Sequence, residues 1–344
     1  MSTQAEATSP PTAGEVELSY REAIRAALED EMESDPRVLL IGEDVAAGGG
    51  VFKTNEGLAE RFGMERVRNT PICENTFVGA ALGMAVTGLR PVVEIMFSDF
   101  LPSCGDAIVN ELPKFRFMSG GQCSVPVTVR SIGGATGRFG TQHSATGESW
   151  YLQLPGLKVA AASSAGAAYG LLRAAIRDDN PVLFFEHKGL YGRKGPVVRG
   201  TAGVAPVGKA RLTRKGADVT IVATLLMADR SLTAAALLAD QGIDAEVLDL
   251  AWLRPLDTAA VAESVSKTGR LVIAEEQVHA AGWGATLISE LTMRGIEWKR
   301  PPCAVSLSDQ VLIPYSPSLE DQVVPSVERI AEVVADTCGK PRAL

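Results

Sequence analysis

The sequence predicts an α/β protein of two domains, each a mostly parallel sheet flanked by helices. Short apolar segments alternate along the chain with segments whose apolar residues recur at helical spacing. This alternation is typical of parallel sheets that helices cover on both faces. The length of 344 residues supports two domains, because a single hydrophobic core seldom grows to that size.

The first domain is predicted over residues 16–192. The capping box Ser19-Tyr20-Arg21-Glu22 indicates where its first helix begins, because both polar side chains can bond free backbone N–H groups there. The other predicted elements, in chain order, are strand 38–41, helix 74–86, strand 91–96, helix 106–118 with an interruption at Pro113, strand 125–130, helix 165–177 and strand 182–187. Residues 131–147 are expected to form a glycine-rich polar loop.

A linker is predicted over residues 193–209, where glycines and prolines are mixed with basic residues. The second domain, residues 210–344, then repeats the alternation of strands and helices. Its predicted elements are strand 219–223, helix 228–241, strand 245–250, helix 258–266, strand 271–275 and helix 281–293. Residues 1–15 are polar and rich in Ser, Thr and Pro, so a disordered tail is expected there.

The composition argues against several classes of protein. A net charge of -8 does not favour nucleic acid or an anionic membrane surface as a partner. No apolar run approaches the roughly 20 residues that a membrane-spanning helix needs. The first residues lack Lys and Arg, unlike a secretory signal or a mitochondrial presequence, so we expect a cytoplasmic protein of bacterial type. The five cysteines occur singly, which predicts neither a zinc site nor a disulfide framework.

Glu74 is the first candidate for a functional residue. It lies between the apolar run Pro71-Ile72-Cys73 and a helix of small residues. One interpretation is that its charge only stabilises the first turn of that helix. The other is a carboxylate in an apolar crevice, where desolvation would raise its pKa and suit it to proton transfer. Folds of this type bind ligands in the crevice at the carboxyl ends of their strands. The residues alone leave both interpretations open.

His143 is the second candidate, because it ends the glycine-rich loop, where a mobile ring and backbone donors can serve catalysis. A single loop histidine is more often a solvated surface residue, and this alternative stays open. His187 and His279 are weaker candidates, and His187 could be structural. The sequence contains no phosphate-binding loop, dinucleotide fingerprint, nucleophile elbow or His-Glu-x-x-His motif. Taken alone, these residues predict a two-domain α/β protein that could be an enzyme.

A set of short motifs adds a more specific indication through its order and spacing. The motifs are Ile41-Gly42-Glu43-Asp44-Val45, Thr70-Pro71-Ile72-Cys73-Glu74-Asn75, Gly88-Leu89-Arg90-Pro91-Val92-Val93-Glu94, Met118-Ser119-Gly120-Gly121, Gln142-His143-Ser144, Ala175-Ile176-Arg177-Asp178-Asp179-Asn180-Pro181 and Leu253-Arg254-Pro255-Leu256-Asp257. Through them the chain resembles the β subunits of pyruvate, branched-chain 2-oxo acid and acetoin dehydrogenases, within the transketolase-like thiamine family. The resemblance extends from about residue 18 to residue 334.

The resemblance implies a pyrimidine-binding domain followed by a transketolase C-terminal-like domain. It also implies oxidative decarboxylation of pyruvate or a related 2-oxo acid, with transfer of the acyl group to a lipoyl arm. Glu74 would hydrogen-bond the aminopyrimidine ring of thiamine diphosphate, Ile72 would line the same pocket, and Phe100 would pack on the ring. His143 would stand at the substrate entrance and either position the substrate or assist acyl transfer.

The resemblance also implies metals and partners. Potassium would be bound by oxygen atoms of Val127, Ala175, Ile176, Asp178 and Asn180, although this loop could simply be a structured helix end. Relatives bind magnesium and diphosphate through a Gly-Asp-Gly motif that this sequence lacks, so an α subunit should supply that half. We therefore expect an α2β2 heterotetramer that docks on a lipoyl-bearing dihydrolipoyl acyltransferase core.

Other functions stay open at this point. Acetoin or branched-chain 2-oxo acids are alternative substrates, since Arg138 and Phe139 add bulk to a loop that is usually small in the family. A non-catalytic scaffold subunit is a further alternative, which the joint presence of Glu74 and His143 disfavours. The chain could also be half of a split transketolase, which the run Met118-Ser119-Gly120-Gly121 disfavours.

Overall fold

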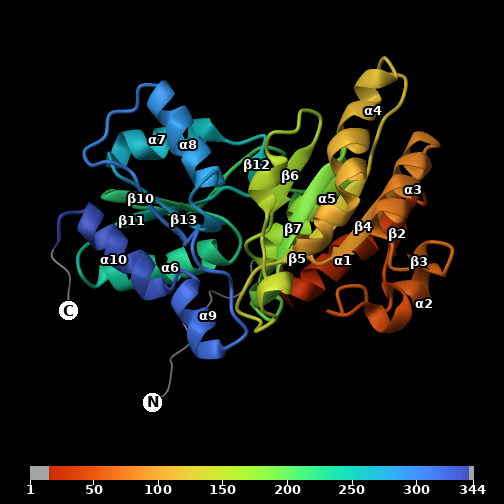
Figure 1. The fold of residues 1–344 in the computed structure, drawn as a ribbon, viewed down its shortest axis with the longest axis horizontal. Helices are drawn as coiled ribbons and strands as arrows, with labels where there is room; N and C mark the ends of the chain where they lie inside the picture. The colour runs from red at the N-terminus through yellow and green to blue at the C-terminus, as the bar shows by residue number, and fades with distance from the viewer. Residues whose placement is uncertain (1–14, 341–344) are drawn as a thin grey trace.

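The computed structural model describes residues 15–340 and contains two α/β units side by side (Figure 1). Residues 1–14 of the predicted disordered tail lie outside the described residues. The prediction is wrong for Glu15, which begins strand β1 (Glu15–Ser19). The α/β class with mostly parallel sheets is confirmed, because each unit is built on such a sheet.

The first unit is built on a seven-stranded sheet with the strand order β12-β6-β7-β5-β4-β2-β3. All neighbouring strands are parallel except β12, which is antiparallel to β6. The strands are β2 (Val38–Gly42), β3 (Val67–Asn69), β4 (Arg90–Met96), β5 (Thr128–Gly133), β6 (Lys158–Ala161), β7 (Val182–His187) and β12 (Trp252–Arg254). Because β12 comes from the second half of the chain, the two units share a sheet edge.

Helices cover both faces of this sheet. Helices α1 (Tyr20–Ser34) and α5 (Ala165–Arg177) share a core with one face, and α3 (Glu74–Val86) and α4 (Leu112–Met118) share a core with the other. The short α2 (Leu58–Phe62) precedes β3. The predicted capping box is present, since Ser19 N–H donates to Glu22 Oε2 at 2.7 Å and Ser19 Oγ accepts from Glu22 N–H at 3.4 Å.

The second unit is built on a five-stranded sheet with the strand order β14-β13-β10-β11-β9. Only β9 runs antiparallel to its neighbour. The strands are β9 (Arg211–Arg214), β10 (Val219–Ala223), β11 (Ala245–Asp249), β13 (Leu271–Val278) and β14 (Cys303–Leu307). Helices α6 (Leu225–Ala239) and α10 (Val327–Thr337) cover one face, and α7 (Thr258–Thr268) and α8 (Trp283–Met293) cover the other (Figure 1). Helix α9 (Pro317–Val323) precedes α10.

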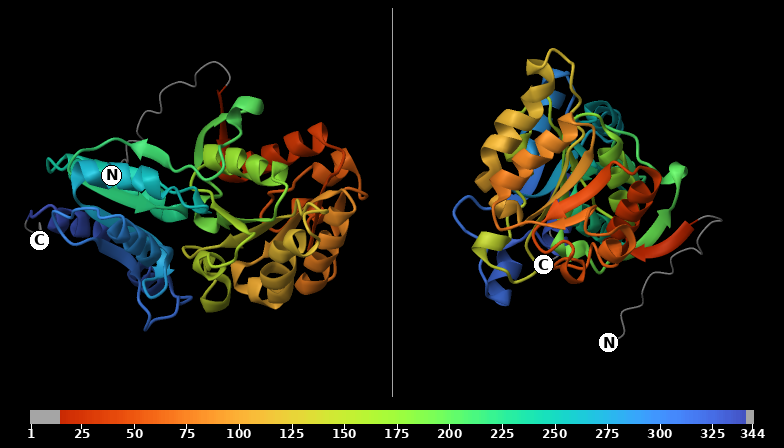
Figure 2. Two further views of the ribbon diagram at one scale, coloured as in Figure 1. Left: turned by 90° about the horizontal axis from the view of Figure 1, so that it is seen from above. Right: turned by 90° about the vertical axis from the view of Figure 1, so that its right-hand side faces the viewer.

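The segment predicted as a linker contributes a strand of its own. Strand β8 (Lys194–Val198) pairs antiparallel with β1, and the two form a separate ribbon beside the first unit (Figure 2). Several predicted boundaries were also wrong. Pro113 lies in the first turn of α4, whereas the irregular stretch is a π-type turn at Asp106–Glu111. The strand predicted at 125–130 is β5, displaced toward Gly133, and the helix predicted at 228–241 begins at Leu225.

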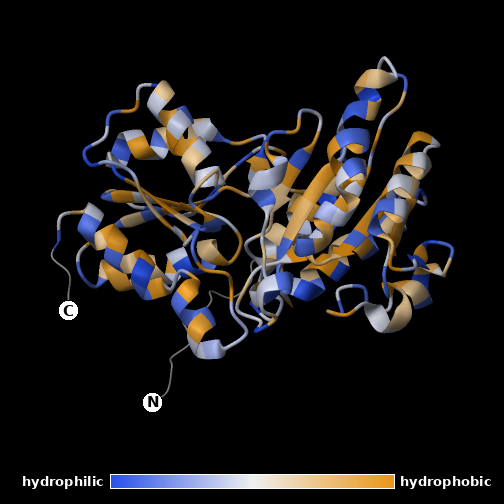
Figure 3. Cartoon of the chain, viewed as in Figure 1, coloured by the Kyte–Doolittle hydropathy of each residue, from blue (hydrophilic) through white to orange (hydrophobic). Residues whose placement is uncertain are grey.

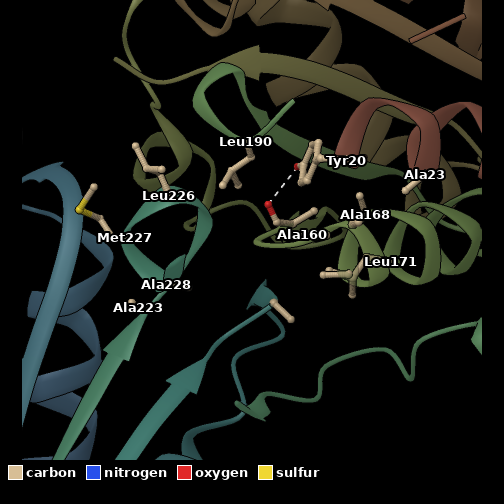
Figure 4. Close-up of a cluster of buried hydrophobic side chains, with 14 of the residues drawn as sticks. Tyr20, Ala23, Ala160, Ala168, Leu171, Leu190, Ala223, Leu226, Met227 and Ala228 are labelled. Carbon is tan, nitrogen blue, oxygen red and sulfur yellow. Dashed lines mark hydrogen bonds between the residues drawn. The ribbon is translucent and has the colours of Figure 1, made fainter. Parts of the chain in front are cut away.

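Apolar residues fill the strands of both sheets, whereas the helices carry apolar and polar faces (Figure 3). The core also continues between the units. Figure 4 shows Leu190, Tyr20 and Leu171 of the first unit near Leu226 and Met227 at the start of α6, and all five side chains belong to one buried cluster. The two units are therefore joined by packed side chains as well as by the shared sheet edge.

A buried ionic cluster lies within the first sheet, on the face that α1 and α5 cover. The guanidinium of Arg130 on β5 donates to Glu94 Oε2 at 2.7 Å and to Glu186 Oε1 at 2.6 Å, on the two neighbouring strands. Asn55 and Tyr191 complete the cluster, donating to Glu94 at 2.9 Å and to Glu186 at 2.9 Å. All three charged side chains are buried away from water, so each charge is stabilised only by its partners in the cluster.

We expect the substitution Arg130→Met to lower the free energy of unfolding by about 3–5 kcal/mol, because it leaves two buried carboxylates without a cation. Denaturant unfolding followed by circular dichroism measures this loss. Arg329→Met is the matched control, since its pair with Glu332 is exposed and should contribute about 0–1 kcal/mol. Equal losses in the two variants would contradict the assigned role of the cluster.

Candidate active site

Glu74 is the first residue of α3, and its side chain is partly exposed. The Cys73 side chain before it caps no backbone N–H of the first turn and bonds the Thr76 hydroxyl instead, at 2.8 Å. The Glu74 carboxylate accepts no hydrogen bond from any described residue. A simple capping role would normally tie a carboxylate to a free backbone N–H group. The geometry instead leaves Glu74 available to a ligand or to a partner chain.

Two groups, half-buried Glu43 and buried Cys104, lie close enough to Glu74 to be affected by its charge. Burial raises the pKa of Glu43, and the neighbouring charges of Glu74 and Asp44 raise it further. The Glu43 Oε1 atom is buried without a hydrogen-bond partner. Burial, followed by the charge of Glu74, raises the pKa of the Cys104 thiol to about 12. Glu43 and Glu74 therefore form a carboxyl pair that the sequence analysis did not single out, although Glu43 stands in the motif that ends β2.

Ile72 precedes Glu74 by two residues and is 84% exposed, which is unusual for a large apolar side chain. It presents an apolar surface beside the free carboxylate. The sequence analysis expected this residue to line a ligand pocket. On this chain alone that surface is open, so any pocket here needs a second molecule to close it.

His143 lies in a cluster of aromatic rings. It ends the turn η4 (Thr141–His143), and its ring packs edge-on against Phe97 and Phe100, with ring centroids 4.9 and 5.4 Å apart. Phe100 belongs to the segment η2 (Ser98–Cys104), and Phe97 directly precedes it. The structure thus brings together two residues predicted for the site, Phe100 and His143, and excludes a freely solvated His143.

The segment η2 connects the two halves of the candidate site. It packs against α3, which carries Ile72 and Glu74 at its start, and against η4, which carries His143. Cys104 at one end of η2 is affected by the charge of Glu74, while Phe100 contacts the His143 ring. The elements that carry Glu74 and His143 therefore both pack against η2, to which Phe100 itself belongs.

Lys188 is a residue of this region that the sequence analysis missed. It is only 9% exposed and begins the turn η6 (Lys188–Leu190) after β7. Its ammonium lies 4.9 Å from the ring centroid of Phe97 and 5.0 Å from that of Phe139, and it donates to the carbonyl of His143. Burial lowers the pKa of Lys188 to about 8, although nearby carboxylates oppose this.

The second unit holds the loop that carries His143. Glu276 on β13 accepts from Ala135 N–H at 2.6 Å, and Ile313 O accepts from the Thr141 hydroxyl at 3.0 Å. The Nε2 atom of His187 lies 3.0 Å from the same Glu276 carboxylate. His187 is fully buried, so it is a structural residue, as one interpretation of the sequence allowed. His279 is largely exposed and belongs to neither half of the site.

A second buried carboxylate, Glu148, lies at the same junction of the two units. It is 1% exposed and accepts a hydrogen bond from Gln277 Nε2 on β13. Burial raises the pKa of Glu148 to about 8, and the charges of Glu276 and Glu275 add to this shift. A cavity of about 340 Å³ opens beside it, between residues 141–150 and the second unit.

The predicted potassium ligands are close together but already engaged. They are Val127, Ala175, Ile176, Asp178 and Asn180. The guanidinium of Arg90 donates to the carbonyls of Ile176 and Asp178 at 3.1 and 3.2 Å, and Arg116 donates to Asn180 Oδ1 at 2.8 Å. The other two carbonyls accept backbone N–H groups. Each predicted ligand thus already accepts one hydrogen bond, and a carbonyl oxygen keeps a second lone pair with which it could bind a cation.

Neither a metal-binding group of side chains nor a membrane-spanning helix occurs among the described residues. Between residues 15 and 340, no group of three or more His, Cys, Asp or Glu side chains is placed to hold a metal ion. No helix in that range is long and apolar enough to span a membrane.

Two family models match the chain in succession. The transketolase pyrimidine-binding domain matches residues 16–194, and the transketolase C-terminal domain matches residues 208–330. A solved split-gene transketolase, described as an inactive β4 tetramer, shares the fold with a TM-score of 0.77 over 94% of this chain and 100% of that chain. Because that transketolase is only 24% identical to this chain, the similarity shows the fold alone.

Closer relatives are found among the β subunits of dehydrogenases. The mitochondrial pyruvate dehydrogenase E1 subunit β-2 of Oryza sativa subsp. japonica is 42% identical over 97% of this chain and 90% of its own length. The corresponding β subunit of Rickettsia conorii is 41% identical over 94% and 99%. The β subunit of the acetoin:2,6-dichlorophenolindophenol oxidoreductase of Bacillus subtilis is 40% identical over 94% and 98%.

The fold and these matches show that the chain belongs to the transketolase-like family of two-domain proteins. Within this family it is a member of the group formed by the β subunits of pyruvate and acetoin dehydrogenases. The resemblance inferred from the ordered motifs is thereby confirmed.

We expect Glu148→Gln to stabilise the chain increasingly as the pH rises. In the folded chain Glu148 keeps its proton up to about 8, whereas its ordinary pKa is 4.5. Between these values the unfolded chain binds fewer protons, so the wild-type chain loses stability as the pH rises. The variant lacks this titration, and the thermal midpoint at several pH values measures the difference. Glu65→Gln is the control, since its side chain is 94% exposed, and equal pH dependence in both variants would contradict the assignment.

Proposed function

We propose that this chain is the β subunit of a thiamine-diphosphate-dependent 2-oxo acid dehydrogenase. The reaction would be the oxidative decarboxylation of pyruvate or a related 2-oxo acid, with transfer of the acyl group to a lipoyl arm. Acetoin and branched-chain 2-oxo acids are the alternative substrates. The observation that carries the proposal is the unbonded Glu74 carboxylate beside half-buried Glu43, in a chain of which 94% aligns with such a β subunit.

The residues around Glu74 fit an aminopyrimidine ring. Its carboxylate is free to share a proton with a ring nitrogen, and exposed Ile72 and half-buried Phe100 provide apolar surface for a flat heterocycle. When bound, thiamine diphosphate supplies the nucleophilic carbon and the electron sink of the reaction. This chain would hold the proton at Glu74 and, through Ile72 and Phe100, exclude water from the ring.

His143 would act at the substrate entrance. Its ring is fixed between Phe97 and Phe100, and Phe100 is also a proposed contact of the cofactor. A ring held in this way can orient a substrate or transfer a proton during acyl transfer, since positioning reduces the entropic part of the barrier.

The remaining half of the site would come from an α subunit. The described part of this chain has no metal-binding cluster, so ligands for magnesium and for the diphosphate would belong to the partner. Exposed apolar side chains support a partner surface on the face that α3 and α4 cover, where Ile72 is 84%, Phe117 89% and Met118 61% exposed. We propose an α2β2 heterotetramer that binds a lipoyl-bearing acyltransferase core.

Potassium stays a prediction, and its test depends on Arg90. The guanidinium already bonds two of the predicted oxygen ligands. We expect Arg90→Met to make the thermal midpoint of the chain depend on potassium more strongly than the wild-type midpoint does, with sodium as the reference salt. An equal shift of the thermal midpoint with potassium in both chains would show that Arg90 does not compete with potassium for these oxygen atoms.

The central test is the substitution Glu74→Ala in the assembled complex. We expect turnover to fall by about 100-fold or more, because the carboxyl group takes part in proton sharing during catalysis. Reduction of an artificial electron acceptor with pyruvate, acetoin or 3-methyl-2-oxobutanoate measures turnover, and circular dichroism checks the fold. Glu65→Ala, at an exposed position, is the control. Near-normal turnover of Glu74→Ala would reduce the residue to a helix-end charge.

Two other functions make different predictions for the same preparations. If the chain is a non-catalytic scaffold subunit, the Glu74→Gln variant should bind thiamine diphosphate and turn over substrate as the wild type does. Half of a split transketolase would give turnover with sugar phosphates and none with the three substrates named above. The end-to-end match to dehydrogenase β subunits favours the dehydrogenase over both.

A further inference from the structure

We infer that Lys188 is a positioning residue for His143, and that its charged ammonium holds the His143 ring in place. The inference deepens the proposed function, because it concerns a residue of the same site. Neither the motifs nor the family match assigns a role to Lys188.

The contacts of the ammonium lead directly to His143. The ammonium donates to the His143 carbonyl, which fixes the backbone at that residue. It also lies over the Phe97 ring, whose edge-on contact with the His143 ring fixes the side chain. The same ammonium lies 5.0 Å from the ring centroid of Phe139, on the loop before His143, and the Phe97 and Phe139 rings are neighbours, with centroids 5.8 Å apart. One charge therefore holds the backbone, the side chain and the preceding loop of His143.

The loop before His143 has a strained backbone that outside contacts must stabilise, whereas Lys188 is fixed by the buried strand that precedes it. Thr136 and Arg138 have φ values of 70° and 60°, a region that non-glycine residues rarely occupy without outside contacts. Lys188 itself follows the buried strand β7, and Leu190 two residues later is 1% exposed in the core shared with α6 (Figure 4). The lysine is the fixed partner and the loop is the part that it orders.

The charged surroundings favour the ammonium form but burial opposes it. Three carboxylates act on Lys188: Asp99 from η2, Glu276 from β13 and Glu320 from α9. The other titratable groups nearby are His143, Arg138 and His187. Burial outweighs the carboxylates, and the pKa of Lys188 falls to about 8. Above that pH the neutral amine loses its attraction to the aromatic faces and weakens its bond to the carbonyl.

A histidine spectrum of the whole chain tests the positioning directly, without any activity. The sequence has 3 histidines, so selective labelling with ¹³C-histidine gives few ring signals, and His143→Asn assigns the relevant one. In the wild type, the edges of Phe97 and Phe100 should displace the His143 signal from that of exposed His279. We expect Lys188→Met to move the His143 signal toward the exposed position, and Lys188→Arg to retain most of the displacement.

The pH dependence separates the charge from mere packing. The wild-type His143 signal should show a change near pH 8 that is absent in Lys188→Arg, because arginine keeps its charge there. Lys267→Met is the matched control, since that ammonium bonds the buried Glu246 in the second unit. An unchanged His143 signal in Lys188→Met, with the fold intact by circular dichroism, would overturn the inference.

A double-mutant cycle in the assembled complex then connects position with reaction. We expect Lys188→Met to slow acyl transfer to a lipoyl domain about 10- to 100-fold, and the pair Lys188→Met/His143→Ala to be no slower than His143→Ala alone. Losses that multiply would show that Lys188 acts independently and would overturn the inference. A wild-type complex without thiamine-dependent turnover would defeat the proposed function, whereas the histidine spectrum would still decide the role of Lys188.

Discussion

The contact on which the rest of this structure depends is the bond between Glu276 of the second unit and His187 of the first, 3.0 Å long and fully buried. Gly189 N–H donates to His187 Nδ1 at 3.0 Å, so the proton is on Nε2 and faces the carboxylate. Burial would raise the pKa of Glu276, but the hydrogen bonds from His187 and from the N–H of Ala135 hold it below its ordinary value. The two units are thereby fixed at the base of the loop that carries His143.

Three consecutive residues at the end of β7 connect the contact between the two units with the core of the first unit and with His143. Glu186 faces the buried Arg130 inside the first sheet, His187 bonds the second unit, and Lys188 reaches the carbonyl of His143. Successive side chains of a strand point to opposite faces, so neighbouring residues can serve the core and the interface at once. The position of His143 is consequently set by the core of one unit and the edge of the other.

The Glu74 side of the site is organised differently. Its carboxylate is unbonded, Ile72 beside it is exposed, and Glu43 keeps a buried oxygen without a partner. Unpaired buried polar groups and exposed apolar surface both raise the free energy of a folded chain. Both are expected in a site that a second molecule completes. Contacts within this chain hold His143 in place, whereas Glu74 has no such partner, which agrees with a β subunit that shares its cofactor with an α subunit.

The sequence alone determined the α/β class, the long helices such as α3 and α5, and the candidates Glu74 and His143, because periodicity and ordered motifs are local properties of the chain. It missed seven short strands, since such segments become strands only when a neighbour pairs with them; these are β1, β3, β6, β8, β9, β12 and β14. It also missed Lys188 and Glu276, because an ordinary surface residue type gains its role only through burial and through partners distant in the chain. The tertiary structure alone decided that His143 is held by aromatic rings and an ammonium, and that Arg90 already bonds two of the predicted potassium ligands.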